Sequence, residues 1–304
     1  MFEFLFLGTS AAAPSVHRGL SAQVVMHDEH RFLVDCGEGT QRQILHAGIG
    51  FKRLDRILIT HGHLDHILGL AGLLSTFARF EIIEQVEIWA GAGALQRIRD
   101  LVFGVALRGG QPGMRIALRE IEAGPLMEFE DFTLSAFPVQ HRGGAFGFAF
   151  EEKSRRPFLA EKAEALGIPA GPIRRELVQG RSVSLPNGRT VHPDEVMGPE
   201  VAGAKLVHVG DCGETGNLVD AARGADALVI EATYLEVERE MAREVNHLTA
   251  RMAAELAREA GVRRLYLTHI SRRYRERDVL AEAAEIFPET TVARDFDGFK
   301  VKRD

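Results

Sequence analysis

The stretch ITHGHLDHILGL at positions 59–70 constrains this chain more than any other part of its sequence. Four side chains able to bind a metal fall within six positions, directly after an apolar run: His61, His63, Asp65 and His66. The pattern predicts a strand that ends at Thr60 and a helix that begins near Asp65. His61 and His63 can then point the same way, because alternate residues of an extended segment share a face. Imidazole and carboxylate are the ligands expected for Zn²⁺ or a related divalent ion.

Further ligands are needed, because four ligands from one turn cannot easily surround a single ion and a catalytic site keeps a position open for water. Candidates stand at the ends of three predicted strands: His141 follows 132–139, Asp211 follows 205–209 and His269 follows 264–268. Strand ends converge on one edge of a sheet, so these side chains can meet there. The more economical geometry is therefore two ions that share remote ligands.

Short strand patterns alternate with amphipathic helical patterns in both halves of the chain, which predicts an α/β fold with sheets buried beneath helices. Further strands are predicted at 2–7, 23–27, 32–35, 56–60, 86–90, 145–150 and 227–231, and helices at 39–47, 66–78, 93–103, 249–260 and 276–286. The tetrapeptide Asp-Cys-Gly-Glu follows a strand at 35–38 and again at 211–214. Two interpretations stay open: a chance repeat, or a fold built from two similar halves.

Residues 153–192 differ from the rest, with four prolines, four glycines and little sheet periodicity. The segment holds eight Lys or Arg against three Glu, a net charge of +5 (8 − 3) in a chain of −6. The simpler interpretation is a solvated connecting loop. A connection of roughly 40 residues is far longer than usual, however, and such lengths are commonly functional or disordered. We therefore expect an inserted arm.

The bulk composition points to a reducing compartment. Two cysteines, Cys36 and Cys212, exclude a disulfide framework. The start MFEFLFLG lacks the basic residues and long apolar core of a signal peptide, and no apolar run approaches the 18 residues of a membrane span. A cytoplasmic protein without a membrane segment is expected, and its net charge of −6 confines any nucleic-acid contact to a local basic patch.

The motifs together resemble the ribonuclease Z family of the metallo-β-lactamase superfamily. HGHLDH at 61–66 is similar to the metal motif of the whole superfamily. Motifs typical of the narrower family occur in the family's order over nearly the whole chain: LGTSAAAPS (7–15), DCGEGTQ (35–41), GHLDHILGL (62–70), GDCGETGN (210–217), EATY (231–234) and THISRRY (268–274). The resemblance implies a four-layer αββα sandwich, one domain over 1–304, and endonuclease activity on the 3′ trailers of precursor tRNA.

Carried over residue by residue, the resemblance implies two divalent ions per chain, with zinc as the expected metal. One ion would be held by His61, His63, His141 and Asp211. The other would be held by Asp65, His66, Asp211 and His269, with Asp211 shared. Two such ions clamp the attacking and leaving oxygens of an in-line displacement and offset the charge of the phosphate. Asp65 would accept a proton from the attacking water.

The resemblance also implies the remaining site residues. Glu231 and His247 match the pair that would deliver a proton to the departing 3′ oxygen, and a carboxylate suits this role because it stabilises an imidazolium. Arg273, with Ser271 beside it, would bind phosphate. The basic insert falls where the family carries an exosite arm that grips tRNA, and GIPAGP at 167–172 is similar to the arm's motif. Family members are commonly homodimers.

Two other functions remain open. The first is hydrolysis of a small phosphodiester, an ester or a lactone by the same fold. Gly19 and Leu248 favour it slightly, because they replace residues typical of the family's tRNA enzymes, while the arm and HISRRY argue against it. The second is a binding protein that has lost its activity, which the complete set of seven ligands makes a poor fit.

Overall fold

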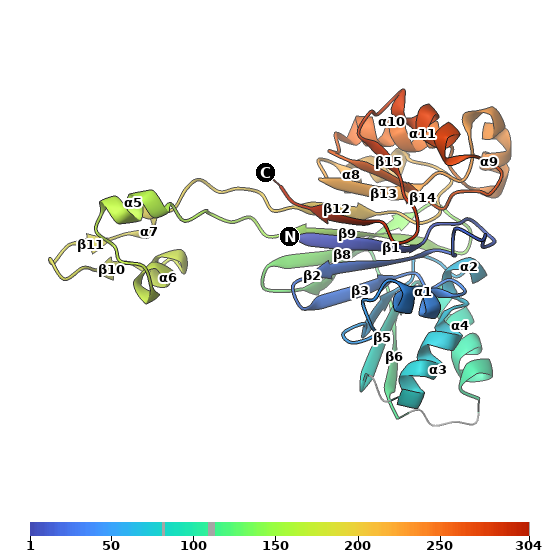
Figure 1. Cartoon of the computed structure of the whole chain (residues 1–304), viewed down its shortest axis with the longest axis horizontal. Coiled ribbons are helices and arrows are strands. Elements are labelled where there is room, and N and C mark those ends of the chain that lie inside the picture. The colour runs from blue at the N-terminus through green and yellow to red at the C-terminus, as the bar shows by residue number, and fades with distance from the viewer. Residues whose placement is uncertain (81–82, 109–112, 304) are drawn as a thin grey trace. The chain divides into compact units, whose positions relative to one another are not determined.

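The computed structural model describes residues 1–80, 83–108 and 113–303 (Figure 1). The chain forms two compact units. The larger consists of residues 1–151 and 204–304, and the smaller of residues 152–203. None of the helices in the described residues has the length and apolarity needed to cross a membrane.

Two seven-stranded sheets form the centre of the larger unit. The first has the order β16 (Gly298–Val301), β1 (Phe2–Gly8), β2 (Ala22–His27), β3 (His30–Val34), β4 (Arg56–Leu58), β5 (Gln85–Ala90) and β6 (Arg115–Glu120). The second has the order β15 (Thr290–Val292), β14 (Leu265–Thr268), β13 (Ala227–Glu231), β12 (Lys205–His208), β9 (Ala145–Glu152), β8 (Phe132–Val139) and β7 (Gly124–Glu128).

The two sheets repeat one arrangement. In the first, β3 pairs antiparallel with β2 and parallel with β4, and the parallel run continues through β5 to β6. In the second, β12 pairs antiparallel with β9 and parallel with β13, and the parallel run continues through β14 to β15. Each copy of Asp-Cys-Gly-Glu follows the strand at this switch, β3 or β12. This is the relation that two similar halves require.

Aromatic side chains from both sheets fill the layer between them. Phe2 packs edge-on against Phe132 of the other sheet with ring centroids 5.5 Å apart, and Phe4 packs edge-on against Tyr266 at 5.2 Å. All four rings are at most 2% exposed. Alternate residues of β1 point into this layer, which is why the strand reads as alternating phenylalanines. Such edge-to-face contacts favour a fixed arrangement of the two sheets.

Helices cover the outer face of each sheet (Figure 1). The first sheet is covered by α1 (Thr40–His46), α3 (Leu70–Phe80), α4 (Ala92–Arg99) and the π-helical turn η1 (Asp100–Ala106). The second is covered by α8 (Val219–Ala222), α10 (Ala250–Ala260) and α11 (Glu276–Ala284). The short helices η2 (Gly216–Leu218), η3 (Glu236–Glu238) and α9 (Arg239–Val245) complete this half. The result is the αββα sandwich expected from the sequence.

The predicted helix 66–78 is two helices, α2 (Leu64–Ile67) and α3. The break has a local cause at Gly69. Its N–H donates to the Cys36 carbonyl at 2.9 Å instead of to the preceding helical turn. A side chain at position 69 would place its Cβ 2.0 Å from the Gly37 carbonyl oxygen, so only glycine allows this approach. The contact fastens the turn after β3 to the helix that carries the metal motif.

The smaller unit has secondary structure and a core of its own. It contains α5 (Ala160–Ala165), α6 (Pro172–Val178), a hairpin of β10 (Val183–Ser184) and β11 (Thr190–Val191), and α7 (Pro193–Val196). Its buried apolar side chains include Ala163, Ile168, Leu177 and Val191. The segment predicted as an insert, 153–192, lies within this unit and is a folded element.

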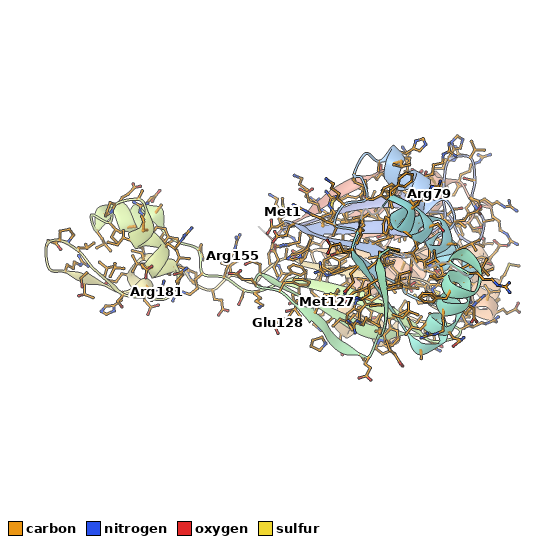
Figure 2. The ribbon with its side chains drawn as sticks, turned by 90° about the horizontal axis from the view of Figure 1, so that it is seen from below. Met1, Arg79, Met127, Glu128, Arg155 and Arg181 are labelled. Atoms are coloured by element: carbon orange, nitrogen blue, oxygen red, sulfur yellow. The ribbon has the colours of Figure 1, made fainter. Side chains whose placement is uncertain are left out.

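The charge of the smaller unit depends on its boundaries. Residues 152–203 contain eight Lys or Arg and seven Asp or Glu, which gives a net charge of +1 (8 − 7). The shorter range 153–192 has a net charge of +5. Several of these arginines form ion pairs within the unit, such as Arg189 with Glu195 and Arg156 with Asp194. The exposed Lys162 and Arg175 make no ion pair with described residues. Figure 2 shows the side chains of this unit, with Arg155 and Arg181 labelled.

Candidate metal centre

All seven side chains predicted as metal ligands meet at the carboxyl ends of the strands. His61 and His63 follow β4, Asp65 and His66 lie on α2, His141 follows β8, Asp211 follows β12 and His269 follows β14. They form two groups, each with its donor atoms within 4.8 Å of one another. Segments up to 204 residues apart in the chain contribute to one group.

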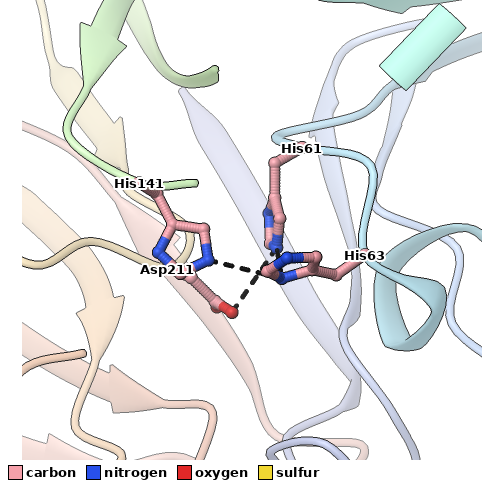
Figure 3. A group of neighbouring side chains, drawn as sticks. All are labelled: His61, His63, His141 and Asp211. Atoms are coloured by element: carbon pink, nitrogen blue, oxygen red, sulfur yellow. Dashed lines mark hydrogen bonds and ion pairs between the residues drawn. The ribbon is translucent and has the colours of Figure 1, made fainter. Parts of the chain in front are cut away.

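The first group contains three histidines and one carboxylate, which point toward one another in Figure 3. His63 Nδ1 lies 2.9 Å from His61 Nε2 and 3.3 Å from His141 Nε2. Asp211 Oδ2 lies 3.6 Å from His61 Nε2. Three imidazole nitrogens and a carboxylate oxygen around one point are a donor set that suits zinc.

The second group contains Asp65, His66 and His269. The His269 Nε2 atom lies 3.4 Å from Asp65 Oδ2 and 3.4 Å from Asp211 Oδ1. His66 Nε2 is also 3.4 Å from Asp211 Oδ1. Asp211 therefore turns one oxygen toward each group, which is the geometry of a shared ligand.

Partners outside each group fix the orientation of the imidazole rings. The Asp35 carboxylate accepts a hydrogen bond from His66 Nδ1 at 2.8 Å and from the Thr60 backbone N–H at 2.8 Å. The Thr60 hydroxyl donates to Asp35, so it accepts from His61 Nδ1 at 3.0 Å. With Nδ1 occupied on the outer side, Nε2 of both rings faces inward and is the nitrogen available to bind a metal.

His141 and His269 follow the same rule, whereas His63 directs its Nδ1 at the first group. His141 Nδ1 donates to the Asn246 carbonyl at 2.9 Å. His269 Nδ1 lies 2.9 Å from the Thr233 hydroxyl, which itself donates to Glu231 and so accepts from the ring. In each case the nitrogen directed at the group is Nε2. Such outer partners raise the basicity of the ligand and hold its tautomer.

Two inward atoms are buried without a hydrogen-bond partner among the described residues: His66 Nε2 and Asp211 Oδ1. A buried polar atom left unpaired is costly, and each such atom calls for an explanation. Both atoms face the second group, where a cation would satisfy them. The residues present therefore fit a pair of divalent ions.

Burial sets the protonation of the first group. Burial lowers the pKa of His61, His63 and His141, so these rings are neutral at neutral pH. Burial alone would raise the pKa of Asp211, but the charges of His269 and His66 hold it well below its ordinary value. Neutral imidazoles and an ionised carboxylate are the forms that bind metal.

Asp65 is held ionised in a similar way. Burial would raise its pKa, but a hydrogen bond from His269 and the charge of His66 lower it well below the ordinary value. The Ala12 backbone N–H also donates to Asp65 Oδ2 at 3.0 Å. Ala12 has a φ of +57°, and Asp35 and His269 have values of +59° and +55°. Such strained backbone gathers at functional sites.

A histidine–carboxylate pair lies next to the second group. His247 Nδ1 is 2.9 Å from Glu231 Oε1, which also accepts the Cys212 N–H at 2.8 Å. Burial alone would lower the pKa of His247, but the charge of Glu231 and its hydrogen bond raise it to about 9. One His247 nitrogen lies within 4.8 Å of donor atoms of Asp211 and His269. The pair can store a proton beside the metal ligands.

The predicted phosphate ligands stand apart from this cluster in the described contacts. Arg273 is half exposed and forms an ion pair with Glu238 at 3.1 Å. Its backbone N–H donates to the Ser271 hydroxyl at 3.4 Å. Four residues that orient the ligands were not predicted from the sequence: Asp35, Thr60, Thr233 and Asn246. Only Asp35 carried a signal, because it opens the tetrapeptide that Asp211 opens in the other half.

The fold and the site define a metallo-β-lactamase-type hydrolase. The family profile described as "Beta-lactamase superfamily domain" matches residues 164–270, and that described as "Anti-Pycsar protein Apyc1" matches residues 2–155. The metallo-β-lactamase fold protein YhfI from Bacillus subtilis has a TM-score of 0.69 at 15% identity over 98% of both chains, which supports the fold alone.

Closer relatives narrow the assignment. The ribonuclease Z of Bradyrhizobium diazoefficiens is 45% identical over 98% of this chain and 99% of its own length. The ribonuclease Z of Archaeoglobus fulgidus is 41% identical over 100% of this chain and 99% of its own. The short form of human tRNase Z matches with a TM-score of 0.68 and 28% identity over 98% of both chains. The chain belongs to the ribonuclease Z family.

Proposed function

We propose that this chain is a metal-dependent endoribonuclease that removes 3′ trailers from precursor tRNA. The observation that carries the proposal is the pair of donor groups joined through Asp211. It occurs in a chain whose relatives, matched over nearly their full length, are ribonuclease Z proteins. Paired metal sites of this kind act on phosphodiesters by in-line displacement.

We assign one ion to His61, His63, His141 and Asp211. The other is assigned to Asp65, His66, His269 and Asp211. The majority of imidazole donors, with carboxylates completing each set, supports zinc as the metal in both positions. When bound, the ions supply a nucleophile at neutral pH and offset the negative charge of the phosphodiester.

Asp65 and the Glu231–His247 pair carry the proton steps in this proposal. The ionised Asp65 is free to accept a proton from the attacking water. The raised pKa of His247 keeps the ring protonated, so it can donate to the departing 3′ oxygen. Glu231 holds the ring through Nδ1, which leaves Nε2 as the donor. Acid and base are thus separate groups in one site.

The substrate is held by residues outside the metal centre. We assign the phosphate nearest the site to Ser271 and Arg273, and Arg273 exchanges its partner Glu238 for the phosphate when RNA binds. The smaller unit, including the predicted arm 153–192, acts as the exosite for tRNA. Its exposed cations Lys162 and Arg175, which form no ion pair with the described residues, would contact backbone phosphates. Such contacts position the RNA without reading its sequence.

We further propose a cytoplasmic homodimer. Exposed leucines on and next to two helices support the dimer: Leu45 on α1 is 59% exposed, Leu64 on α2 is 54% exposed, and Leu68 directly after α2 is 38% exposed. A second subunit that covered these side chains would remove their apolar surface from water. The two buried free cysteines, Cys36 and Cys212, suit a reducing compartment.

A cleavage assay tests the function. A precursor tRNA with a 3′ trailer is incubated with the metal-loaded protein, and the products are mapped at nucleotide resolution. We expect a single cut at the junction of the mature 3′ end and the trailer. A protein that hydrolyses a chromogenic phosphodiester but leaves the precursor intact would favour the small-substrate alternative instead.

A further inference from the structure

A cavity of about 350 Å³ lies in the larger unit. Its lining comes from three places: the loop 14–19, helix α1 with the turn before it, and the turn that contains Phe296. The volume falls in the range of small-ligand pockets. None of the residues assigned to metal binding or proton transfer lines this cavity.

The chain segments next to two of the cavity walls contact candidate metal ligands. The segment that leads into the loop 14–19 contains Ala12, whose N–H donates to Asp65 Oδ2 at 3.0 Å. The turn on the other side begins with Asp35, which orients His66. The cavity and the candidate metal ligands are therefore linked by two short segments of the chain, 12–14 and 35–38.

An aromatic pair forms one side of the cavity. The rings of His46 and Phe296 are stacked, with centroids 6.2 Å apart and an interplanar angle of 26°. Phe296 is 43% exposed and has a φ of +71°, a backbone conformation that bulky residues rarely adopt. Its N–H donates to the Phe6 carbonyl at 2.7 Å, which fixes this conformation. An exposed ring held by strained backbone points to a ligand.

The wall behind the rings is rigid. The Asp295 carboxylate accepts hydrogen bonds from Gly19 N–H at 2.6 Å, from Thr9 Oγ1 at 2.7 Å and from Gln43 Nε2 at 2.8 Å. It therefore ties the loop, the first strand and α1 to the residue directly before Phe296. A preformed wall lowers the ordering cost of binding.

The charge at the rim suits a phosphate. Arg42 is exposed on α1 and makes no hydrogen bond or ion pair with described residues, so its guanidinium is available. Arg18 is not available, because it is engaged by Glu276 and by the Ala293 carbonyl. The exposed carboxylate of Glu38 offers an acceptor for the edge of a base.

We propose that this cavity binds one unpaired nucleotide of the substrate RNA, adjacent to the scissile phosphate. The base stacks on Phe296 and His46, and Arg42 contacts its phosphate. Stacking on an aromatic side chain requires a base that is free of a duplex. The proposal rests on the proposed ribonuclease function and adds a subsite to it.

The test pairs a change in the protein with a change in the RNA. Precursor tRNAs carrying one abasic position each, on either side of the cleavage site, are cleaved by the metal-loaded wild type and by Phe296→Leu. We expect Phe296→Leu to raise KM about 5- to 150-fold, the range for loss of one stacked base. One abasic position should raise the KM of the wild type by the same factor, and it should cause no further rise in the KM of Phe296→Leu.

Phe296→Tyr should restore the wild-type KM. Phe103→Leu, which changes an exposed ring on η1, serves as the control.

Two results of the cleavage experiment would overturn the subsite. One is a KM of Phe296→Leu and Arg42→Gln within twofold of the wild type. The other is additivity of Phe296→Leu with every abasic position. Binding of a fluorescent single-stranded RNA, measured without cleavage, separates this from failure of the proposed function. If the wild type leaves precursor tRNA uncut, the proposed function is wrong. The subsite is then tested by oligonucleotide binding alone: weaker binding by Phe296→Leu supports it, and unchanged binding contradicts it. Competition by a free nucleoside monophosphate at equal affinity would assign the cavity to a mononucleotide and contradict the proposal.

Discussion

Individual residues divide into those that could be found in the sequence and those that could not. The seven candidate ligands were predictable because four of them fall within six positions and because the surrounding motifs resemble those of a known family, although each remote candidate alone is an ordinary polar residue at a strand end. Thr60 and Thr233 were not, because threonine is ordinary in strands and their roles exist only where the chain brings them to a histidine. Asp35 falls between these cases, since its tetrapeptide was noticed but its contact with His66 was not.

Asp35 should matter for metal affinity although it binds no metal. It orients His66 and Thr60, and loss of an outer partner of this kind typically costs 10- to 100-fold in metal affinity. We expect Asp35→Asn to weaken binding of the second metal equivalent by about that factor, measured by titration against a competing chelator. The control Asp220→Asn changes a side chain that is 91% exposed. Unchanged affinity in Asp35→Asn would remove its assigned role.

Asp65 should matter for chemistry more than for folding. We expect Asp65→Ala to remain folded and to bind precursor tRNA, because the mutation removes one ligand and the proposed base but no part of the apolar core. Turnover should fall by about 10²- to 10⁴-fold, the range for loss of a general base. Circular dichroism, tRNA affinity and single-turnover cleavage check the three parts. Near wild-type turnover would mean that another group accepts the proton.

The Glu231–His247 pair predicts how activity depends on pH. The acid form of His247 is present below its pKa, so cleavage should decline as pH rises through it. Glu231 raises that pKa to about 9, and a nearby bound cation would act in the opposite direction because it disfavours the charged ring. Glu231→Gln removes the raising charge, so the alkaline limb of kcat should move to lower pH. A limb at the same pH in both proteins would show that another group titrates.

Elements were predicted best where their residue pattern is strong. The alternating phenylalanines of β1 and the small apolar face of α10, capped by Thr249 and Gly261, were found almost to the residue. The edge strand β6 was missed, because none of its residues is fully buried and its pattern does not alternate. The division between α2 and α3 was missed because it depends on Cys36, 33 residues away from Gly69 (69 − 36).

The smaller unit should serve tRNA and not chemistry. Replacing residues 155–190 with a short Gly/Ser linker removes none of the predicted ligands, so hydrolysis of a chromogenic phosphodiester should persist. Precursor-tRNA affinity should fall sharply. The double variant Lys162→Gln, Arg175→Gln should reduce the slope of log affinity against log salt by about 2, because two phosphates are no longer neutralised. Arg156→Gln, already paired with Asp194, is the control. If the deletion leaves the slope of log tRNA affinity against log salt unchanged, the smaller unit does not contribute to tRNA binding.

At the scale of the whole molecule, the symmetry of the two sheets explains where the site lies. Each sheet switches from antiparallel to parallel pairing at one strand, and Asp35 and Asp211 follow those strands. One half uses its aspartate to orient His66, and the other uses its aspartate to join the two donor groups. The sequence showed the repeated tetrapeptide but not the different roles of its two aspartates. These roles depend on strands that are far apart in the chain and pair only in the folded protein.

The central claim is that two ions, joined through Asp211, are both required for cleavage. Metal-free protein is titrated with Zn²⁺ while cleavage of precursor tRNA and bound metal per chain are measured on the same samples. The account predicts two ions per chain at saturation, with activity that rises mainly with the second equivalent and stays constant beyond it. Full activity with one tightly held ion per chain would contradict it.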